Sequence, residues 1–187
     1  MLRTPRFRTI ASVAALSLAS AAQAQVVAPV APTQAFDAAV AEGCVPVIAQ
    51  RLSLNAPSEA LARASLRTHQ PNAVEQAAFA DFSAETRAFA SRPATGGATV
   101  VLGEDAARGV CRVALFGAPE RDLSATRSYL EALVRTLTRA RVQPNLTEYS
   151  GSIDGSPRLR LAVETPPPLA GPLSGPQLIL TFAREGA

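Results

Sequence analysis

The single histidine of the chain, His69, is the first side chain to consider for catalysis, because an imidazole can act as a general base near neutral pH. It stands in the polar run 68–72, and a hydrolase would need it beside a serine and a carboxylate. The chain has no Gly-x-Ser-x-Gly motif, and its nearest approximation, residues 151–155, is better explained by turn chemistry. We therefore predict no catalytic residue and expect His69 to be a surface side chain.

Paired carboxylates and metal ligands are the next candidates. Glu104 with Asp105 and Glu120 with Asp122 stand close in sequence, whereas glycoside hydrolysis needs two acids that face each other across a cleft. Acids at a helix start are already explained by the helix macrodipole. One histidine and two cysteines cannot supply the usual zinc ligands, and the chain has no phosphate loop, calcium loop or Rossmann fingerprint. The sequence thus predicts no metal and no cofactor.

The arginines offer a possible binding site. Residues 158–163 alternate arginine with apolar residues, which in a strand puts Arg158 and Arg160 on the face opposite the core. Arg112 joins them if Cys111 faces the core on its own strand. Such a face could bind an anionic ligand through paired guanidinium hydrogen bonds. The alternative is a solvated surface with cross-strand ion pairs to nearby acids.

The two cysteines, Cys44 and Cys111, are most simply a disulfide in an exported protein. Neither belongs to a Cys-x-x-Cys motif, and neither has a histidine beside it to lower the pKa of a thiol. A bridge that closes so long a loop is worth about 4 kcal/mol in the chain-entropy description. We therefore predict a structural disulfide between them.

The N-terminal segment has the three parts of a secretory signal. Three arginines lie in the first eight residues, an apolar run occupies 10–21, and Ala-Gln-Ala at 22–24 is a small-x-small cleavage site. We predict a signal peptide over 1–24, cleavage before Gln25, and a periplasmic or secreted protein. The apolar run is shorter than the roughly 20 residues of a membrane-spanning helix, so no transmembrane segment is expected.

Charge and length narrow the class of protein further. The predicted signal peptide carries three arginines and no acid, so its removal lowers the formal charge from +3 to zero. A neutral chain gives no reason to expect nucleic acid as a partner. The remaining length fits one domain, and the use of arginine without lysine hints at a GC-rich bacterial source. We expect the partner to be an anionic ligand or an envelope protein.

Hydrophobic periodicity predicts a single α+β domain over 34–187, after a flexible leader at 25–33. Phe36, Val40 and Cys44 share one helical face, which predicts a short amphipathic helix, and Pro46 restrains the backbone that follows. Further short helices are expected from about residue 58 and over 72–82, and a long amphipathic helix over 122–141.

The strands are predicted by β-rich runs bounded by turn residues. They cover residues 99–102, 110–116, 146–151, 158–163 and 177–182, and the first two form a hairpin. Asp154-Gly155 predicts a second hairpin. The expected architecture is an antiparallel sheet of about five strands, with one long helix packed on a face and short N-terminal helices tied to the sheet by the disulfide.

Two sequence contexts carry a resemblance. The pattern Ala-Phe-x-x-x-Val-x-x-Gly-Cys at 35–44 and the run Gly-Val-Cys-Arg-Val at 109–113 resemble small exported alphaproteobacterial proteins of unknown function, with two cysteines. The resemblance implies the periplasmic compartment and the disulfide, and it transfers no activity.

These observations favour a non-catalytic periplasmic binding or interaction module over the alternative of a small envelope hydrolase. Two geometries separate them. A concave pocket that holds His69 or two converging carboxylates favours the enzyme, whereas an open arginine-bearing sheet favours binding.

The first prediction concerns processing and redox state. The mature protein is expected to begin at Gln25 and to hold no free thiol, because the cleavage site and the cysteine pair have no better explanation. Intact mass of the secreted protein, with and without alkylation under denaturing conditions, measures both. Alkylation of two cysteines without reduction would contradict the disulfide.

Overall fold

A computed structural model describes residues 27–167 and 175–186 of the chain. The predicted signal peptide 1–24 and the cleavage site before Gln25 lie outside these residues. The described part confirms the α+β class, and it contains no helix that is both long and apolar enough to cross a membrane.

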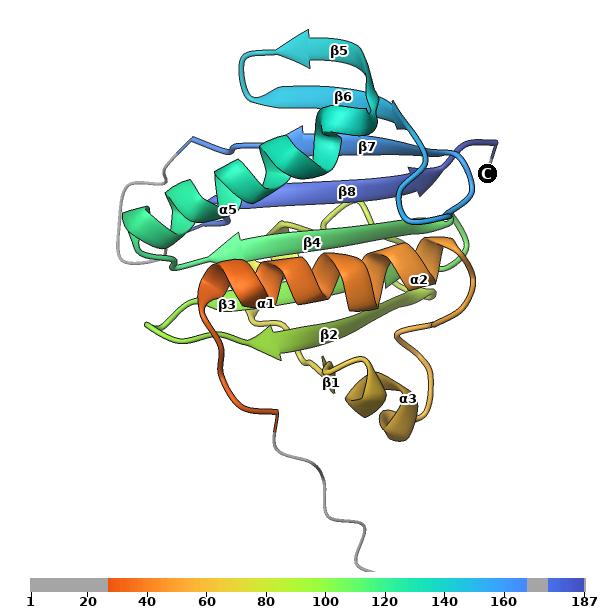
Figure 1. The fold of residues 1–187 in the computed structure, drawn as a ribbon. Helices are drawn as coiled ribbons and strands as arrows, with labels where there is room; N and C mark the ends of the chain where they lie inside the picture. The colour runs from red at the N-terminus through yellow and green to blue at the C-terminus, as the bar shows by residue number, and fades with distance from the viewer. Residues whose placement is uncertain (1–26, 168–174, 187) are drawn as a thin grey trace, which may run out of the picture.

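One antiparallel sheet organises the described chain, and it has more strands than the sequence predicted (Figure 1). Its order is β1-β2-β3-β4-β8-β7-β6-β5. The strands are β1 (Arg67–Thr68), β2 (Arg87–Pro93), β3 (Thr99–Asp105), β4 (Val110–Phe116), β5 (Thr138–Gln143), β6 (Leu146–Gly151), β7 (Leu159–Glu164) and β8 (Leu178–Arg184). The five expected strands are confirmed as β3, β4, β6, β7 and β8. The expectation of about five is corrected by β1, β2 and β5.

Both predicted hairpins are confirmed. Strands β3 and β4 pair from Thr99↔Phe116 to Asp105↔Val110. The β6–β7 turn contains Asp154 and Gly155, with φ of 47° and 70°. These two positive φ values and the hydrogen bond from the Ser156 N–H to the Ile153 carbonyl mark a tight turn within the connection 152–158, which joins the two strands.

The N-terminal helix is longer than the short helix predicted, and it continues past Pro46 to Ile48. It runs without interruption through α1 (Pro32–Ala38), a π-helical segment η1 (Ala39–Cys44) and α2 (Val45–Ile48). The Val45 N–H donates to the Val40 carbonyl five residues back. The helix is therefore already wound in the wider π form just before Pro46, whose nitrogen has no hydrogen to donate.

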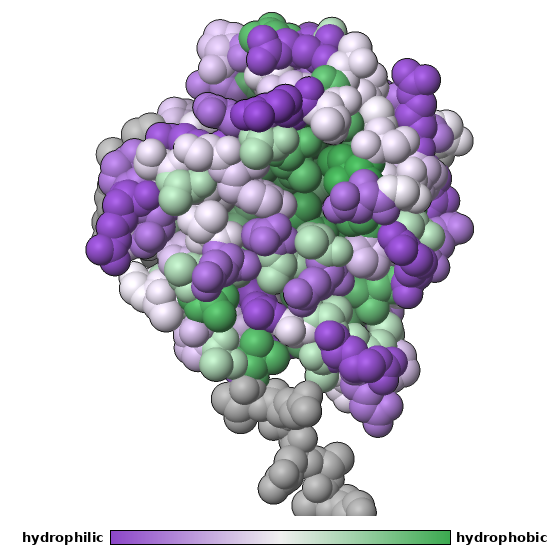
Figure 2. All heavy atoms as spheres, in the orientation of Figure 1, coloured by the Kyte–Doolittle hydropathy of each residue, from purple (hydrophilic) through white to green (hydrophobic). Residues whose placement is uncertain are grey.

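The long helix is shorter than predicted. It comprises α5 (Glu120–Leu133) and one 3-10 turn, η2 (Val134–Thr136), and residues 138–141 belong to strand β5 instead. Helix α5 and the N-terminal helix lie on the same face of the sheet (Figure 1). Their first turns touch, with the Thr33 hydroxyl donating to the Asp122 carbonyl at 3.2 Å. Figure 2 shows apolar residues gathered between the two helices where they diverge.

Two short helices complete the described chain, α3 (Ser58–Arg63) and α4 (Ala73–Ala77). The expected helix over 72–82 is reduced to α4. The Asn72 side chain accepts from Val74 N and Glu75 N and so fixes its start.

Strand β4 is buried on both faces. On the helix side, Cys111, Val113 and Leu115 face the core as the sequence predicted. On the opposite side, Ala114 and its neighbours pack under Phe79 and Phe82, both from the segment after α4. This second apolar layer was not predicted. It depends on Gly103 of β3, since a Cβ there would lie 2.6 Å from a Phe79 ring carbon.

The predicted disulfide is confirmed. Cys44, at the end of the π segment, is bonded to Cys111 of β4, and both residues are fully buried. The bridge fixes the N-terminal helix to a central strand of the sheet. It joins residues 67 positions apart, so it restricts the unfolded chain strongly.

The double substitution Cys44→Ala with Cys111→Ala is expected to lower the free energy of unfolding by about 2–5 kcal/mol, because the unfolded chain regains the freedom of the closed loop. Urea denaturation measures the change. Reductant should bring the wild type close to the double variant and leave the variant unaltered. Identical midpoints for the oxidised wild type and the variant would contradict this role.

Candidate functional site

A cavity of about 470 Å³ opens at the end of the sheet where the N-terminal helix stops. Its apolar wall includes Val47, Leu52, Ala56 and Ala60, and its polar groups include Gln50, Arg51, Ser53, Glu104 and Arg184. The loop that follows α2 and the end of the β3–β4 hairpin enclose it. Its volume lies in the range of sites for small molecules.

The loop around the cavity begins at a sharp change of backbone direction. Helix α2 ends at Ile48, and Gln50 adopts a left-handed conformation with φ of 57°. A residue in this conformation just beyond a helix turns the chain away from the helix axis. In the residues that follow, Ser53 and Leu54 contact Glu104 near the end of β3.

Glu104 holds this loop in place. It is only 6% exposed, and its Oε2 accepts hydrogen bonds from the Leu54 N–H at 2.6 Å and the Ser53 hydroxyl at 2.9 Å. Both bonds go to the same oxygen, and no side chain or backbone group of the described residues donates to Oε1. Oε1 is not among the fully buried atoms without a hydrogen-bond partner, so it is open to the cavity and available to water or to a ligand.

Arg184 lines the same cavity as Glu104. In β8, Leu178, Leu180 and Phe182 face the helices, and Arg184 continues this alternation at the strand end. Its Nη2 donates to the Ile48 carbonyl at 3.1 Å. With its side-chain oxygen turned toward the guanidinium, Gln50 accepts from both terminal nitrogens, at 3.0 and 3.2 Å.

Arg51 adds a second guanidinium at the exposed rim of the cavity. Arg51 and Arg184 were missed by the sequence analysis, as was the placement of Glu104 beside them. The alternation of β8 could have indicated the face of Arg184. Nothing in the sequence indicates that the end of α2 comes to lie beside it.

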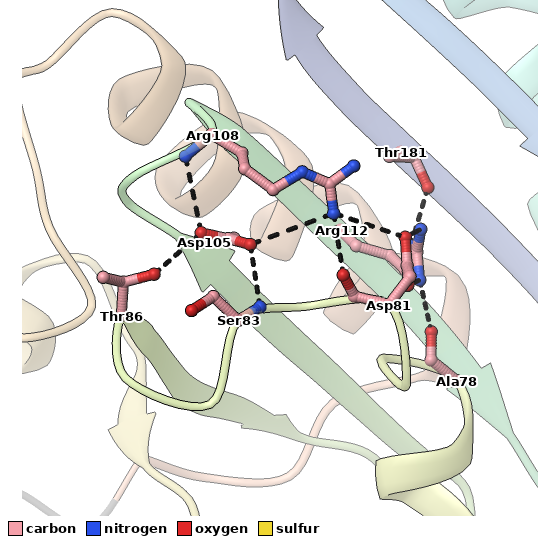
Figure 3. Close-up of polar contacts among 8 residues, drawn as sticks. All are labelled: Ala78, Asp81, Ser83, Thr86, Asp105, Arg108, Arg112 and Thr181. Atoms are coloured by element: carbon pink, nitrogen blue, oxygen red, sulfur yellow. Dashed lines mark hydrogen bonds and ion pairs between the residues drawn. The ribbon is translucent and has the colours of Figure 1, made fainter.

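Glu104 and Asp105 do not converge, because strand alternation sends neighbouring side chains to opposite faces. Asp105 is fully buried on the side away from the helices. It accepts from the Ser83 N–H at 3.0 Å and the Thr86 hydroxyl at 2.8 Å (Figure 3). Asp105 also lines the cavity, but its carboxylate is bonded to Ser83 and Thr86, so among the described residues the cavity has no pair of facing carboxylates.

Arg112 is committed to a structural contact. Its guanidinium binds both carboxylate oxygens of Asp81, at 2.6 and 3.0 Å, and also the Thr181 hydroxyl and the Ala78 carbonyl (Figure 3). It also lies over the Phe82 ring, 4.9 Å from its centroid. The side chain is only 12% exposed, so it fixes the segment after α4 to the sheet and is not available to a ligand.

The other two arginines of the predicted patch do not complete it. Arg158 is paired with Glu185 at 2.8 Å, and Arg160 is exposed on β7. Arg160 and Arg112 do lie on the same face, as their register with β8 shows, but β8 separates them. The expected group of three available guanidinium groups is thus not present.

His69 is not an isolated surface side chain, which corrects the sequence expectation. Its Nε2 lies 3.0 Å from Glu75 Oε2, and the histidine side chain is 22% exposed. The same Glu75 oxygen accepts from the Asn72 N–H, so the contact belongs to the cap of α4. His69 does not line the 470 Å³ cavity.

The described residues contain no group of three or more side chains suited to hold a metal ion. Comparisons with protein-family models, with curated proteins and with solved structures find no match to the chain. The site must therefore be interpreted from its own chemistry.

Two aspartates of the second layer have pKa values below the ordinary value of 3.8. For Asp81, burial acts to raise the pKa, but the hydrogen bond and the charge of Arg112 outweigh it. For Asp105, burial also acts to raise the pKa, and the hydrogen bonds from Ser83 and Thr86 outweigh it. Both carboxyl groups are thereby held ionised in the folded protein.

These shifts predict a loss of stability in acid. A carboxyl group whose pKa is lower folded than unfolded stabilises the protein above the unfolded value, about 3.9, and this contribution disappears as the pH falls through the folded value. The free energy of unfolding should therefore decline below about pH 4. Urea denaturation across pH measures it. Asp81→Asn and Asp105→Asn should each flatten the decline, and slopes equal to that of the wild type would contradict the assignment.

Proposed function

We propose that the chain is an exported, non-catalytic binding module whose ligand occupies the 470 Å³ cavity. One observation carries the proposal: a single cavity brings together a buried carboxylate with one oxygen left to a ligand, Glu104, and two guanidinium groups, Arg51 and Arg184. The ligand class that fits this arrangement is a small zwitterion, such as a free amino acid or a short peptide.

Each part of such a ligand has a matching group. A ligand carboxylate suits a guanidinium, which can donate two parallel hydrogen bonds to it. A ligand ammonium suits Glu104, whose Oε1 would gain a charged donor. The wall formed by Val47, Leu52, Ala56 and Ala60 suits an apolar side chain. A ligand with both charges would thus find an opposite charge for its ammonium at Glu104 and for its carboxylate at Arg51 or Arg184.

Export is part of the proposal. The buried disulfide supports it, since such bonds persist in oxidising compartments such as the periplasm. The signal-type N-terminal sequence supports it independently, and membership among small exported alphaproteobacterial proteins remains a proposal that rests on the two cysteine contexts.

Calorimetric titration with the dipeptide Leu-Ala tests the ligand class. Leu-Ala is expected to bind, whereas N-acetyl-Leu-Ala and Leu-Ala amide should each bind at least about tenfold weaker, because each lacks one of the two charges, a loss of about 1.4 kcal/mol. Equal affinity for the three compounds would overturn the zwitterion assignment. Release of free leucine during the titration would favour the hydrolase alternative.

Two cavity variants and one control variant test whether the ligand binds in the cavity. Arg184→Met and Glu104→Gln should each weaken Leu-Ala binding about tenfold or more, since each removes the partner of one ligand charge. Arg160→Met, an exposed arginine on the opposite face of the sheet, should bind like the wild type. Circular dichroism confirms the fold of each variant. A loss confined to Arg160→Met would move the site to the arginine-bearing face.

A further inference from the structure

We propose that the outer edge of β5 binds an extended acidic segment of a partner protein, which adds to the sheet as a further strand. Strand β5 ends the sheet, and among the described residues it pairs with β6 alone. All six of its residues are exposed. Its outward backbone groups therefore offer a template for strand addition, with affinity from main-chain hydrogen bonds.

The opposite edge of the sheet, strand β1, is less suited to strand addition than β5. Strand β1 has two residues and packs beside α3, so it offers little length for pairing. Strand β5 has six residues and carries Val142, which is 62% exposed, the highest exposure among the large apolar side chains of the described chain. An exposed valine on an edge strand gives an added strand an apolar neighbour to pack against.

The charged side chains around β5 indicate that the partner segment is acidic. Arg135, Arg139 and Arg141 are all exposed, and none takes part in an ion pair among the described residues. From residue 123 to residue 147 the sequence has a single acid, Glu131, and the next acid, Glu148, lies opposite Arg141 on β6 without forming an ion pair with it. Figure 2 shows strongly hydrophilic residues at the top of the view, where β5 lies. This edge is therefore basic and complementary to an acidic segment.

A bulge distributes the two strand arginines over both faces of the sheet. The register shifts between Arg139 and Arg141, so that Arg139 lies opposite Tyr149 and Arg141 lies opposite Glu148. Tyr149 is on the helix side and Glu148 on the other, and the Arg139 guanidinium lies 5.9 Å from the Tyr149 ring centroid. Consecutive residues of an added strand also point to opposite faces. Two adjacent acids in a β-prone segment would therefore each meet an arginine.

A second copy of the chain is a poorer occupant. Two β5 edges placed side by side would bring Arg139 and Arg141 of both copies together, and like charges facing each other across strands are destabilising. Arginines and a bulge are also common means by which an edge resists self-association. The same groups attract an acidic strand.

The probe is the acetylated, amidated peptide Trp-Thr-Val-Glu-Glu-Val-Thr. Because the protein has no tryptophan, fluorescence anisotropy excited at the indole reports the peptide alone. The acidic peptide should bind at least about tenfold tighter than its Lys-Lys counterpart, and added salt should weaken it. The substitutions Arg139→Glu with Arg141→Glu should reverse this preference. Arg184→Met, in the cavity, should leave peptide binding unchanged, which separates this test from that of the proposed ligand.

Backbone methylation distinguishes strand addition from attraction by charge alone. Only alternate N–H groups of an added strand point to its neighbour, so N-methylation in one alternating phase should abolish binding and in the other phase should preserve it. We expect N-methylation to abolish binding in one phase only, and the acidic peptide to bind tighter than the lysine peptide. Equal binding of the acidic and lysine peptides, indifference to methylation in both phases, or a wild-type dimer that excludes the peptide would each overturn the proposal.

Discussion

Two adjacent residues of strand β4 hold the layers that pack on the two faces of the sheet. Cys111 points to the helix side and is bonded to the N-terminal helix, while Arg112 points to the other side and holds Asp81 with two hydrogen bonds. Strand alternation makes this division possible, since neighbouring side chains leave a strand on opposite faces. One short strand thereby fixes the relative positions of a covalently attached helix and an ionically attached segment.

The proposed ligand cavity follows from the first of these attachments. With Cys44 bonded to the sheet, α2 must end near the ends of β3 and β8, where Glu104 and Arg184 stand. The loop after α2 is then drawn over Glu104, which satisfies one carboxylate oxygen and leaves the other to the cavity. Arg184 meets the C-terminal end of the helix, where a cation is favoured by the helix dipole. The groups proposed to bind ligand charges are thus also groups that position the loop, and binding should rigidify it.

The two ends of the sheet have different properties. At the β1 end a helix and a very short strand leave little backbone to pair, whereas at the β5 end the whole strand is exposed beside three arginines. The bulge there changes which face each arginine occupies, because one extra residue shifts the alternation by one position. The cavity and the edge lie on different strands, so a small ligand and an extended partner segment could be bound by the same molecule.

The sequence by itself determined the local and periodic features: five strands, two hairpins, the helix face of Cys44, and the inward side of Cys111, because these follow from alternation, turn chemistry and the scarcity of cysteine. Tertiary structure decided the rest. Strand β2 is rich in alanine and arginine and becomes a strand only by pairing with β3, and the end of the predicted long helix becomes β5 by pairing with β6. Three further contacts form only in the folded chain. Arg112 binds Asp81, His69 contacts Glu75, and Glu104 and Arg184 line one cavity. Such contacts carry no sequence period, so only the folded chain determines which charges remain available to a ligand.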